Sequence, residues 1–354
     1  MPHPLAQDLD HVLAHTADVW QALRGQSMFI TGGTGFVGTW LTESLVCADE
    51  HLGLGIRAVL LTRDPEAFRA KAPHVAGSPS VHMLRGDMAS SELPDGEYPY
   101  VIHAAIAAQA TASPLSSFDE DVAGTRRVLE FARTHGTRRL LFTSSGAVYG
   151  KQPPDLSHVS EDYAGAPATT DTTAYSHAKR VSEFLCASYA RQYGFDALIA
   201  RLFAFVGPHL PLDANYAVGN FIRDVLRGGP VRIAGDGTPY RSYLYAADLA
   251  VWLWTILVRG ESARPYNVGG SCAVTIAELA RIVVDATVPG TPVEIAGQPT
   301  RIRTRYVPDT TRAEQELGLR ALVSLEDGVR RTYNWHRQGS AEFASPAAAQ
   351  RGLR

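Results

Sequence analysis

Short apolar runs alternate with amphipathic stretches through the first two thirds of the chain. The apolar runs are short and bounded by turn-forming residues, and they predict strands over 27–31, 56–62, 81–86, 100–105, 138–145 and 197–205. Helical periodicity falls between these runs, most clearly over 36–48, 117–135 and 175–193. Strands that are apolar on both faces and joined by helices are typical of parallel sheets. The pattern therefore predicts an α/β fold, a Rossmann-type doubly wound parallel sheet.

The pattern changes after residue 206, where loop-like sequence such as "GPHLPLDANYAVG" separates shorter helices. We expect this part to form a smaller C-terminal substrate-binding domain over 207–240 and 272–336. The Rossmann-type domain then comprises 26–206 and 241–271. Two segments lie outside both domains: a helical extension on the surface over 1–25, and a disordered tail over 337–354, which lacks a periodic apolar face.

Composition and charge narrow the classes of protein. Of 354 residues, 45% are hydrophobic and 19% charged, which is the profile of a globular protein. The net charge of −3 and the absence of a Lys/Arg-rich run argue against nucleic-acid binding. We expect no membrane span or signal peptide, because no apolar run is long enough. The cysteines form no CxxC pair and are expected to be reduced thiols, so a cytoplasmic protein is expected; they are Cys47, Cys186 and Cys272.

A glycine-rich turn follows the first predicted strand and opens the first long helix. Gly32, Gly35 and Gly38 have GxxGxxG spacing. Such a turn needs glycine for a tight bend, for close approach of the backbone to a pyrophosphate, and for close packing of helix on strand. The helix N-terminus adds free N–H groups and the positive end of the helix dipole. The turn therefore predicts a dinucleotide-binding site.

The end of the second strand bears on the choice between NAD and NADP. An acidic residue for the ribose hydroxyls commonly stands there, but this chain has Arg63, followed by Asp64. An arginine can pair with a 2′-phosphate, so the sequence leans towards NADP and leaves NAD open. Asp87 follows the third strand and is positioned to accept a hydrogen bond from an adenine amino group.

A second group of residues indicates hydride-transfer chemistry. Tyr175 and Lys179 are four residues apart at the start of a predicted helix, so they share one helix face. A lysine cation close to the phenol lowers its pKa and allows it to act as a base. The segment "TSSGAVYG" ends the fifth strand, and ligands of open α/β sheets bind at strand carboxyl ends. A serine there can hydrogen-bond the oxygen on which the tyrosine acts.

These motifs together resemble the extended short-chain dehydrogenase/reductase family, in its NAD(P)-dependent nucleotide-sugar epimerase/dehydratase branch. The resemblance runs from about 26 to 336 and includes "TGGTGFVG", "GDM", "VIHAA", "TSSGAVYG", "YSHAK", "RLFAFVGP" and "GDGTPYRSYLYAADLA". It implies Tyr175 as the catalytic base, Lys179 as its electrostatic partner and ribose anchor, and Ser145 as the hydroxyl partner. The expected cofactor-binding residues are Gly32, Gly35, Phe36, Val37, Gly38, Arg63, Asp87, Met88, Ala104, Ala105 and Lys179.

The resemblance also implies residues that bind a nucleotide-diphosphate sugar. Asn220 and Arg241 fall where the family grips the diphosphate, and Arg301 and Arg303 are weaker candidates. Tyr149 is a candidate for contact with the sugar, with a packing role left open. Asp248 is expected to hold a turn. The family often dimerises through two long helices, which here would be 117–135 and 175–193.

The implied reaction starts with transient oxidation of a sugar hydroxyl, usually at C4. Family 4,6-dehydratases carry an acidic pair after the catalytic Ser/Thr, but here Gly146 and Ala147 stand there, so an epimerase (an isomerase) ranks above a dehydratase. Asp121 and Ala204 stand where the family often has asparagine, which leaves the sugar open.

Other classes of protein fit the sequence less well. Arg63 favours an NADPH-dependent keto-sugar reductase, an oxidoreductase, as the alternative. A non-catalytic dinucleotide sensor would be expected to lose Tyr175 or Lys179, and both are present. No metal site is expected, because His11 and His15 lack an HExxH glutamate or a third ligand and are expected on a helix surface.

Overall fold

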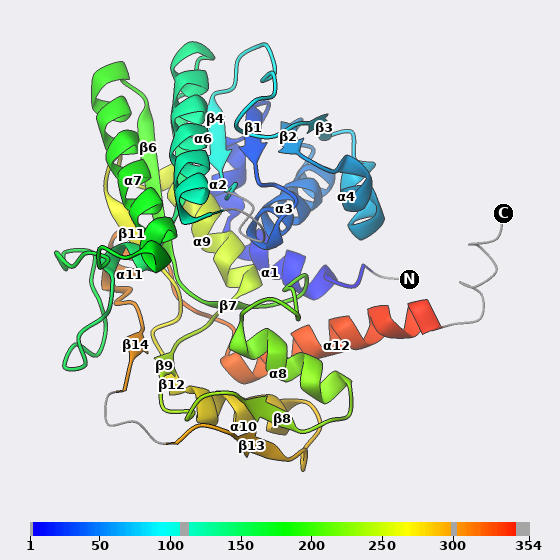
Figure 1. The fold of residues 1–354 in the computed structure, drawn as a ribbon. Helices are drawn as coiled ribbons and strands as arrows, with labels where there is room; N and C mark the ends of the chain where they lie inside the picture. The colour runs from blue at the N-terminus through cyan, green and yellow to red at the C-terminus, as the bar shows by residue number, and fades with distance from the viewer. Residues whose placement is uncertain (1–2, 107–112, 299–302, 345–354) are drawn as a thin grey trace.

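The computed structural model describes residues 3–106, 113–298 and 303–344 (Figure 1). Its centre is a seven-stranded parallel sheet in the order β11-β6-β5-β4-β1-β2-β3, which confirms the Rossmann-type doubly wound α/β fold. All six strands predicted in the first two thirds of the chain belong to it. The strands are β1 Ser27–Thr31, β2 Arg57–Thr62, β3 Val81–Arg85, β4 Tyr100–His103, β5 Arg139–Ser145, β6 Asp196–Leu202 and β11 Pro265–Val268.

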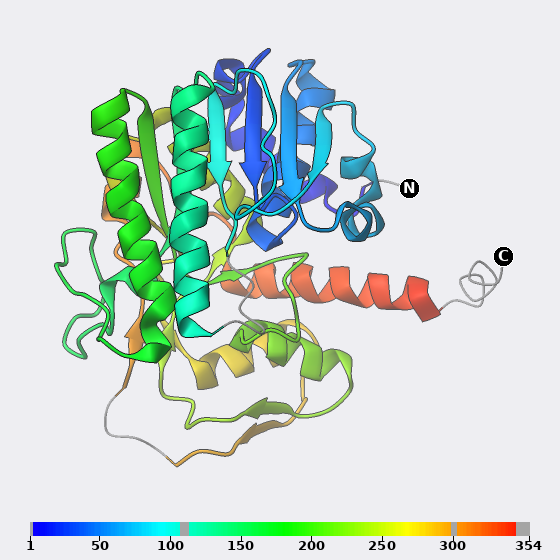
Figure 2. The ribbon, with the colours of Figure 1, turned by 45° about the horizontal axis from the view of Figure 1, so that its top comes forward.

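Helices cover both faces of this sheet (Figures 1 and 2). On one face lie α3 (Phe36–Leu52) and α9 (Ala246–Arg259), and their apolar side chains share one core with the sheet. On the other face α6 (Pro114–Thr134) and α7 (Ala174–Tyr193) run side by side. Two short helices, α4 (Pro65–Lys71) and α5 (Pro73–Ala76), lead from β2 to β3.

Alternation along the strands explains the two cores. In β1, Met28 and Ile30 belong to the core under α3 and α9, whereas Phe29 belongs to the core under α6 and α7, as the two-residue period of a strand requires. Helix α9 is buried along nearly its whole length, including Trp252 and Trp254. A helix that is apolar all round in this way must be enclosed by other elements.

The N-terminal extension forms two helices, α1 (Ala6–His15) and α2 (Ala17–Ala22), where one was expected. Buried Thr16 separates them. The extension also contributes to the core, since apolar side chains of both helices are fully buried, and the Trp20 and Trp254 rings lie 4.9 Å apart. The extension is therefore part of the Rossmann core and not only a surface helix.

Past the carboxyl ends of the strands lies the smaller C-terminal part, at the bottom of Figure 1. It contains α8 (Ala217–Leu226), α10 (Ile276–Ala286) and α12 (Leu325–Ala344), with α11 (Thr311–Leu317) against β11. Short strands join it together: β7 Phe205–Val206 with β10 Leu244–Tyr245, β8 Val231–Ile233 with β13 Val293–Ile295, and β9 Tyr240–Arg241 between β12 Val274–Thr275 and β14 Arg305–Tyr306.

Helix α12 corrects the expected start of the disordered tail. The tail was expected from 337, but the helix continues to Ala344, and 345–354 lie outside the described residues. The extra turns contain residues of high helix propensity, Gln338, Ala341 and Glu342. Among the helices that the structure describes, none has the length and apolar character needed to cross a membrane.

Candidate active site

The glycine turn between β1 and α3 has the geometry of a phosphate cradle. Gly32 has φ +72°, and a Cβ there would lie 2.4 Å from the carbonyl carbon of Ala104. A Cβ on Gly38 would lie 2.1 Å from the Gly32 oxygen, so only glycine fits at both positions. Gly35 is the N-cap of α3. Because it has no side chain to cap the helix, the N–H groups of the first turn, including those of Phe36 and Val37, remain available for an anion.

A groove of ≈ 840 Å³ begins at this turn and follows the carboxyl ends of β1, β2, β3 and β4. Most of the expected cofactor residues line it, namely Gly32, Gly35, Arg63, Asp87, Met88, Ala104 and Ala105. Phe36 and Val37 instead pack their side chains against the core behind the turn. Seven of the expected cofactor residues, including the turn glycines Gly32 and Gly35 and the arginine Arg63, therefore line one groove.

The residue after β2 carries positive charge into this groove. Arg63 is exposed, and the Arg85 guanidinium donates a 3.4 Å hydrogen bond to its carbonyl oxygen. Asp64 is the N-cap of α4, where its carboxylate accepts a 3.0 Å bond from the Ala67 N–H. The acidic neighbour of Arg63 is thus already engaged in holding a helix terminus.

Asp87 is held by its own loop. Its carboxylate accepts hydrogen bonds from the Ser90 hydroxyl (2.8 Å), the Ser90 N–H (2.8 Å) and the Ala89 N–H (2.7 Å). These bonds keep the pKa of Asp87 below its usual value, with those from Ser90 first. The carboxylate therefore shapes the loop over the groove and stays ionised for a ligand.

Lys71, which sequence reasoning missed, also lines the groove. It ends α4, and its ammonium donates to the Thr34 carbonyl (3.2 Å) and the Thr39 hydroxyl (3.0 Å), both beside the glycine turn. Burial lowers its pKa. No motif marks this lysine, because it reaches the turn from an element more than thirty residues later in the chain.

Tyr175 and Lys179 lie on α7 against the carboxyl end of β5. The Lys179 side chain is buried, its Nζ donates to the Thr143 carbonyl (3.1 Å), and it lies 5.8 Å from the Tyr175 ring centroid. Burial lowers the pKa of Lys179 to about 8, and the Asp121 carboxylate opposes this shift. The structure thus brings the predicted pair together, with the cation largely desolvated.

Tyr175 does not have the lowered pKa that the sequence analysis expected. Burial raises the pKa of the phenol well above its usual value, although a hydrogen bond with Ser145 opposes the rise. The reason is that Lys179 is itself desolvated and directed at a backbone carbonyl, so burial of the phenol is the larger effect. The phenol is consequently protonated at neutral pH in this state.

Ser145 ends β5 and caps the following 3-10 helix η1 (Gly146–Tyr149), where its hydroxyl accepts a 3.2 Å bond from the Ala147 N–H. Tyr306 of β14, which the sequence analysis did not select, places its hydroxyl 3.5 Å from the Ser145 hydroxyl. Burial raises the pKa of Tyr306 to about 12. Three neutral hydroxyl groups, those of Ser145, Tyr175 and Tyr306, therefore meet at one point.

The position after Ser145 is sterically closed. A Cβ on Gly146 would lie 2.6 Å from the Phe203 ring and 2.8 Å from the Tyr306 hydroxyl. A larger acidic side chain at Gly146 would need both aromatic residues to move. The surroundings of this position therefore leave no room for an acidic side chain.

Tyr149 is buried beside this cluster in a polar network. Its hydroxyl donates to Asn267 Oδ1 (2.7 Å) and accepts from Arg201 Nη1 (2.9 Å), and Arg201 is paired with Glu183 at 2.7 Å. The hydroxyl therefore has partners on both sides, which favours the packing role for Tyr149 over contact with a sugar.

The expected diphosphate-binding residues lie in the smaller part. Arg241 on β9 is paired in register with Tyr306 of β14, so it lies near the hydroxyl cluster. Asn220 on α8 accepts a 3.2 Å bond from Arg223, and among the described residues no hydrogen bond links it to Arg241. Arg303 donates to the Tyr240 hydroxyl at 3.2 Å, and Arg301 lies outside the described residues.

Asp248 holds the chain together away from the groove. Its carboxylate accepts bonds from the N–H groups of Leu322 (2.8 Å) and Val323 (2.9 Å), as expected for a residue that holds a turn. It also lies 2.7 Å from His11 Nε2. His11 was expected on a helix surface, but it is partly buried in this contact between α1 and α9.

Comparisons with known proteins agree with this geometry. The model of the NAD dependent epimerase/dehydratase family matches residues 28–269. UDP-glucuronic acid decarboxylase 1 of Arabidopsis thaliana is 28% identical over 307 residues, which cover 85% of this chain and 68% of that protein.

Solved structures share the fold. DesIV, a dTDP-glucose 4,6-dehydratase from Streptomyces venezuelae with NAD bound, has a TM-score of 0.76 at 24% identity and covers 90% of this chain and 98% of that one. A UDP-glucose 4-epimerase from Thermotoga maritima, in complex with UDP-glucose, has a TM-score of 0.74 at 22% identity and covers 89% of this chain and 100% of that one.

Proposed function

The chain belongs to the NAD dependent epimerase/dehydratase family, and within this family we propose that it is a nucleotide-sugar epimerase. A sugar hydroxyl at C4 is oxidised to a ketone and then reduced again from the opposite face. The observation that carries the proposal is the meeting of Ser145, Tyr175 and Lys179 at the end of β5. Neighbouring β4 ends at the groove that begins at the glycine turn.

A dinucleotide fits the groove. The cradle formed by Gly32 and Gly38 excludes any side chain at these two positions, and the first turn of α3 offers uncapped N–H groups for a pyrophosphate. Lys71 stands beside the turn, and Arg63 also lines the groove. When bound, the nicotinamide supplies the acceptor and donor of the hydride.

The side chains of the cluster divide the proton movement. In its phenolate form, Tyr175 Oη takes the proton from the C4 hydroxyl and returns it during reduction, while Ser145 Oγ hydrogen-bonds the same sugar oxygen. The Lys179 ammonium stabilises this phenolate, which exists before the oxidation and again after the reduction. Tyr306 adds a third neutral hydroxyl next to Ser145, and we propose that it orients the sugar through a hydrogen bond.

The closed position at Gly146 supports epimerisation over dehydration. Elimination of water across C5 and C6 needs a general acid and base near the sugar, and neither Gly146 nor Ala147 can supply one. The space that an acidic side chain would take is held by Phe203 and Tyr306.

Decarboxylation is the second candidate, favoured by the name of the Arabidopsis thaliana relative. Oxidation at C4 of a sugar with a C6 carboxylate gives a β-keto acid, which loses carbon dioxide without a further acid–base pair. Gly146 and Ala147 are compatible with that outcome as well, so the substrate offered decides between the two reactions.

Arg63 supports a preference for NADP over NAD, because the exposed guanidinium can pair with a 2′-phosphate while Asp64 is engaged at the α4 N-terminus. An NADPH-dependent keto-sugar reductase is the corresponding alternative reaction. Arg241, with Asn220 and Arg301 as further candidates, is proposed to bind the diphosphate of the nucleotide sugar.

A homodimer formed by α6 and α7 is also proposed. Leu115 on α6 is 76% exposed and Phe184 on α7 is 68% exposed, and large exposed apolar side chains on adjacent helices favour a partner surface. Phe184→Asp is expected to halve the mass measured by light scattering. Leu322→Asp, at an apolar residue exposed elsewhere, is the control, and an unchanged mass for Phe184→Asp would contradict the proposal.

The protein is proposed to act in the cytoplasm. Cys47, Cys186 and Cys272 are all free thiols, and Cys272 is exposed. Reducing compartments maintain thiols in this state. Fractionation of the source cells tests this location.

The reaction is tested with a panel that includes UDP-glucose, UDP-glucuronic acid and dTDP-glucose, with and without added NAD or NADP, and with products identified by NMR. An epimerised sugar formed without net consumption of cofactor supports the proposal. Net consumption of NADPH supports the reductase, and loss of carbon dioxide from UDP-glucuronic acid supports the second candidate. Either result, without epimerisation of any sugar, overturns the epimerase proposal.

A further inference from the structure

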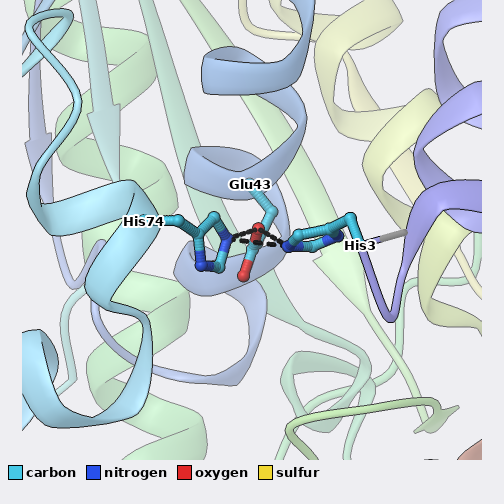
Figure 3. A group of neighbouring side chains, drawn as sticks. All are labelled: His3, Glu43 and His74. Carbon is cyan, nitrogen blue, oxygen red and sulfur yellow. Dashed lines mark hydrogen bonds and ion pairs between the residues drawn. The ribbon is translucent and has the colours of Figure 1, made fainter. Parts of the chain in front are cut away.

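Three segments that are distant in the sequence bring imidazole and carboxylate groups together on the outer side of α3. His3 precedes α1, Glu43 lies in the middle of α3, and His74 lies in α5. Figure 3 shows the three side chains directed towards one another. Their ligating atoms all lie within 4.8 Å of each other. No motif or local spacing in the sequence connects these three residues.

The distances are those of a metal-binding group. His74 Nε2 lies 2.6 Å and His3 Nε2 lies 3.9 Å from Glu43 Oε2, and the two Nε2 atoms lie 3.0 Å apart. Tetrahedral ligands at about 2.0–2.1 Å from a zinc ion are themselves roughly 3.3 Å apart. The three observed separations lie on both sides of this value, so small side-chain rotations would accommodate the ion.

Protons alone do not satisfy this arrangement. His3 Nδ1 accepts a 3.2 Å bond from the Leu5 N–H, so in the neutral ring the proton lies on Nε2 and faces His74 Nε2. If His74 Nε2 accepts that hydrogen bond, it carries no proton, and its lone pair faces the Glu43 carboxylate at 2.6 Å. If His74 Nε2 instead donates to Glu43, two N–H groups face each other at 3.0 Å. A cation between the three atoms removes the conflict, with the proton of His3 moved to Nδ1 and the long Leu5 contact given up.

Burial of the carboxylate is the second, independent observation. The Glu43 side chain is 1% exposed, and a buried carboxylate needs compensating positive charge. Its other oxygen, Oε1, lies 3.5 Å from His209 Nε2, too far for a well-formed hydrogen bond. His209 is itself buried and has φ +69°, a conformation uncommon for a non-glycine residue. It stands where an outer partner of a ligating carboxylate is found.

We propose that His3, Glu43 and His74 form a binding site for a divalent transition-metal ion, Zn²⁺, with water at the fourth position and His209 behind Glu43. Two imidazoles and one carboxylate suit Zn²⁺, whereas Mg²⁺ and Ca²⁺ require oxygen ligands. His3 and His74 are 32% and 43% exposed, which gives the ion a path from solvent. The ion would fasten the N-terminal extension to α3 and α5.

The site is independent of the proposed hydride chemistry, so the two can fail separately. The full-length protein is stripped with a chelator and titrated with Zn²⁺ alone, and bound metal per chain is measured after dialysis. We expect one Zn²⁺ per chain and a thermal transition raised by the ion. His3→Ala and His74→Ala should each weaken binding by at least about tenfold, because even outer-shell partners have effects of this size.

The controls separate a built site from incidental binding. His15→Ala removes an exposed histidine that stands four residues from His11 and should leave Zn²⁺ affinity unchanged. Both ligand variants replace partly exposed side chains, and retained dinucleotide binding shows that they fold. The proposal is overturned by less than one bound ion per chain, by equal affinity in His74→Ala and the unmodified protein, or by a loss of affinity in His15→Ala as large as in His74→Ala.

Discussion

Two buried charges lie on opposite faces of the same sheet. The surroundings disfavour the charged form of one and favour the charged form of the other. Lys179, on α7, is buried with a backbone carbonyl as its hydrogen-bond acceptor, and burial lowers its pKa to about 8. Glu43, on α3, is equally buried, and burial alone would raise its pKa, but His209 and His74 lower it to about 2. The neighbours of Lys179 do not offset the cost of burying its charge, whereas the neighbours of Glu43 more than offset it. We call the first charge under-compensated and the second over-compensated.

The difference is consistent with a reactive role proposed for Lys179 and a structural role for Glu43. A cation whose neighbours do not offset its desolvation gains from any negative charge that forms near it, such as a phenolate on Tyr175. An anion already surrounded by imidazoles gains nothing further from a reaction, and it holds its neighbours in place. The sign and size of the compensation, more than burial itself, therefore indicate which charged site does chemistry.

The largest expected effect is at the proposed catalytic cluster. Tyr175→Phe removes the group that moves the proton and leaves Lys179 buried, so turnover of the nucleotide sugar is expected to fall by about 10²–10⁴-fold. Tyr193→Phe, on the same helix and 42% exposed, is the matched control and should retain turnover. Full activity of Tyr175→Phe would contradict the proposed role of Tyr175 in moving the proton.

The next effect tests the over-compensated charge. Glu43→Gln, measured in chelator, is expected to lower the free energy of unfolding by about 3 kcal/mol at pH 7. Because the folded pKa lies below the unfolded value, this stabilisation is present above about pH 4.5 and is lost as pH falls towards 2. Denaturant unfolding across this range measures it. Glu50→Gln, on the exposed side of α3, is the control variant.

Lys179→Met tests the under-compensated charge. The folded pKa of about 8 lies below the unfolded value near 10.5, so the unfolded chain binds more protons between these values and stability rises with pH. The native protein is expected to gain up to about 3 kcal/mol relative to Lys179→Met between pH 8 and 10.5. Unfolding of both proteins at each pH measures the gain, and exposed Lys151→Met is the control. A flat difference would show that Lys179 is compensated after all.

The smallest expected effect is at a charge that is exposed to solvent. Arg63 is exposed, so solvent screens it, and Arg63→Ala is expected to reduce the preference for NADP over NAD by about tenfold. Binding titrations with both dinucleotides measure the ratio, with exposed Arg69→Ala as the control. An unchanged ratio would contradict the assignment of NADP to Arg63.

Much of the fold could be predicted because buried parallel strands leave a local signal. The strand expected over 56–62 is β2, Arg57–Thr62. The strand expected over 197–205 was too long, because the chain leaves the main sheet after Leu202 and Phe205 begins β7, which pairs with β10. Apolar residues continue through this change, so periodicity could not reveal which sheet they join.

The site could be predicted only where it is built from local motifs. The glycine turn and the Tyr175–Lys179 pair each occupy one short segment. Tyr306, Lys71 and the group around Glu43 depend on contacts between segments far apart in the chain. No period or spacing joins residues 3, 43 and 74, so their meeting is a property of the tertiary fold.

The pairing of β9 with β14 connects the two parts of the proposed substrate site. Arg241, proposed for the diphosphate, and Tyr306, beside Ser145, are register partners on adjacent strands. A displacement of one strand must therefore move the other, since their backbones share hydrogen bonds. The two strands therefore hold the residue proposed for the diphosphate and the hydroxyl beside Ser145 at one fixed separation.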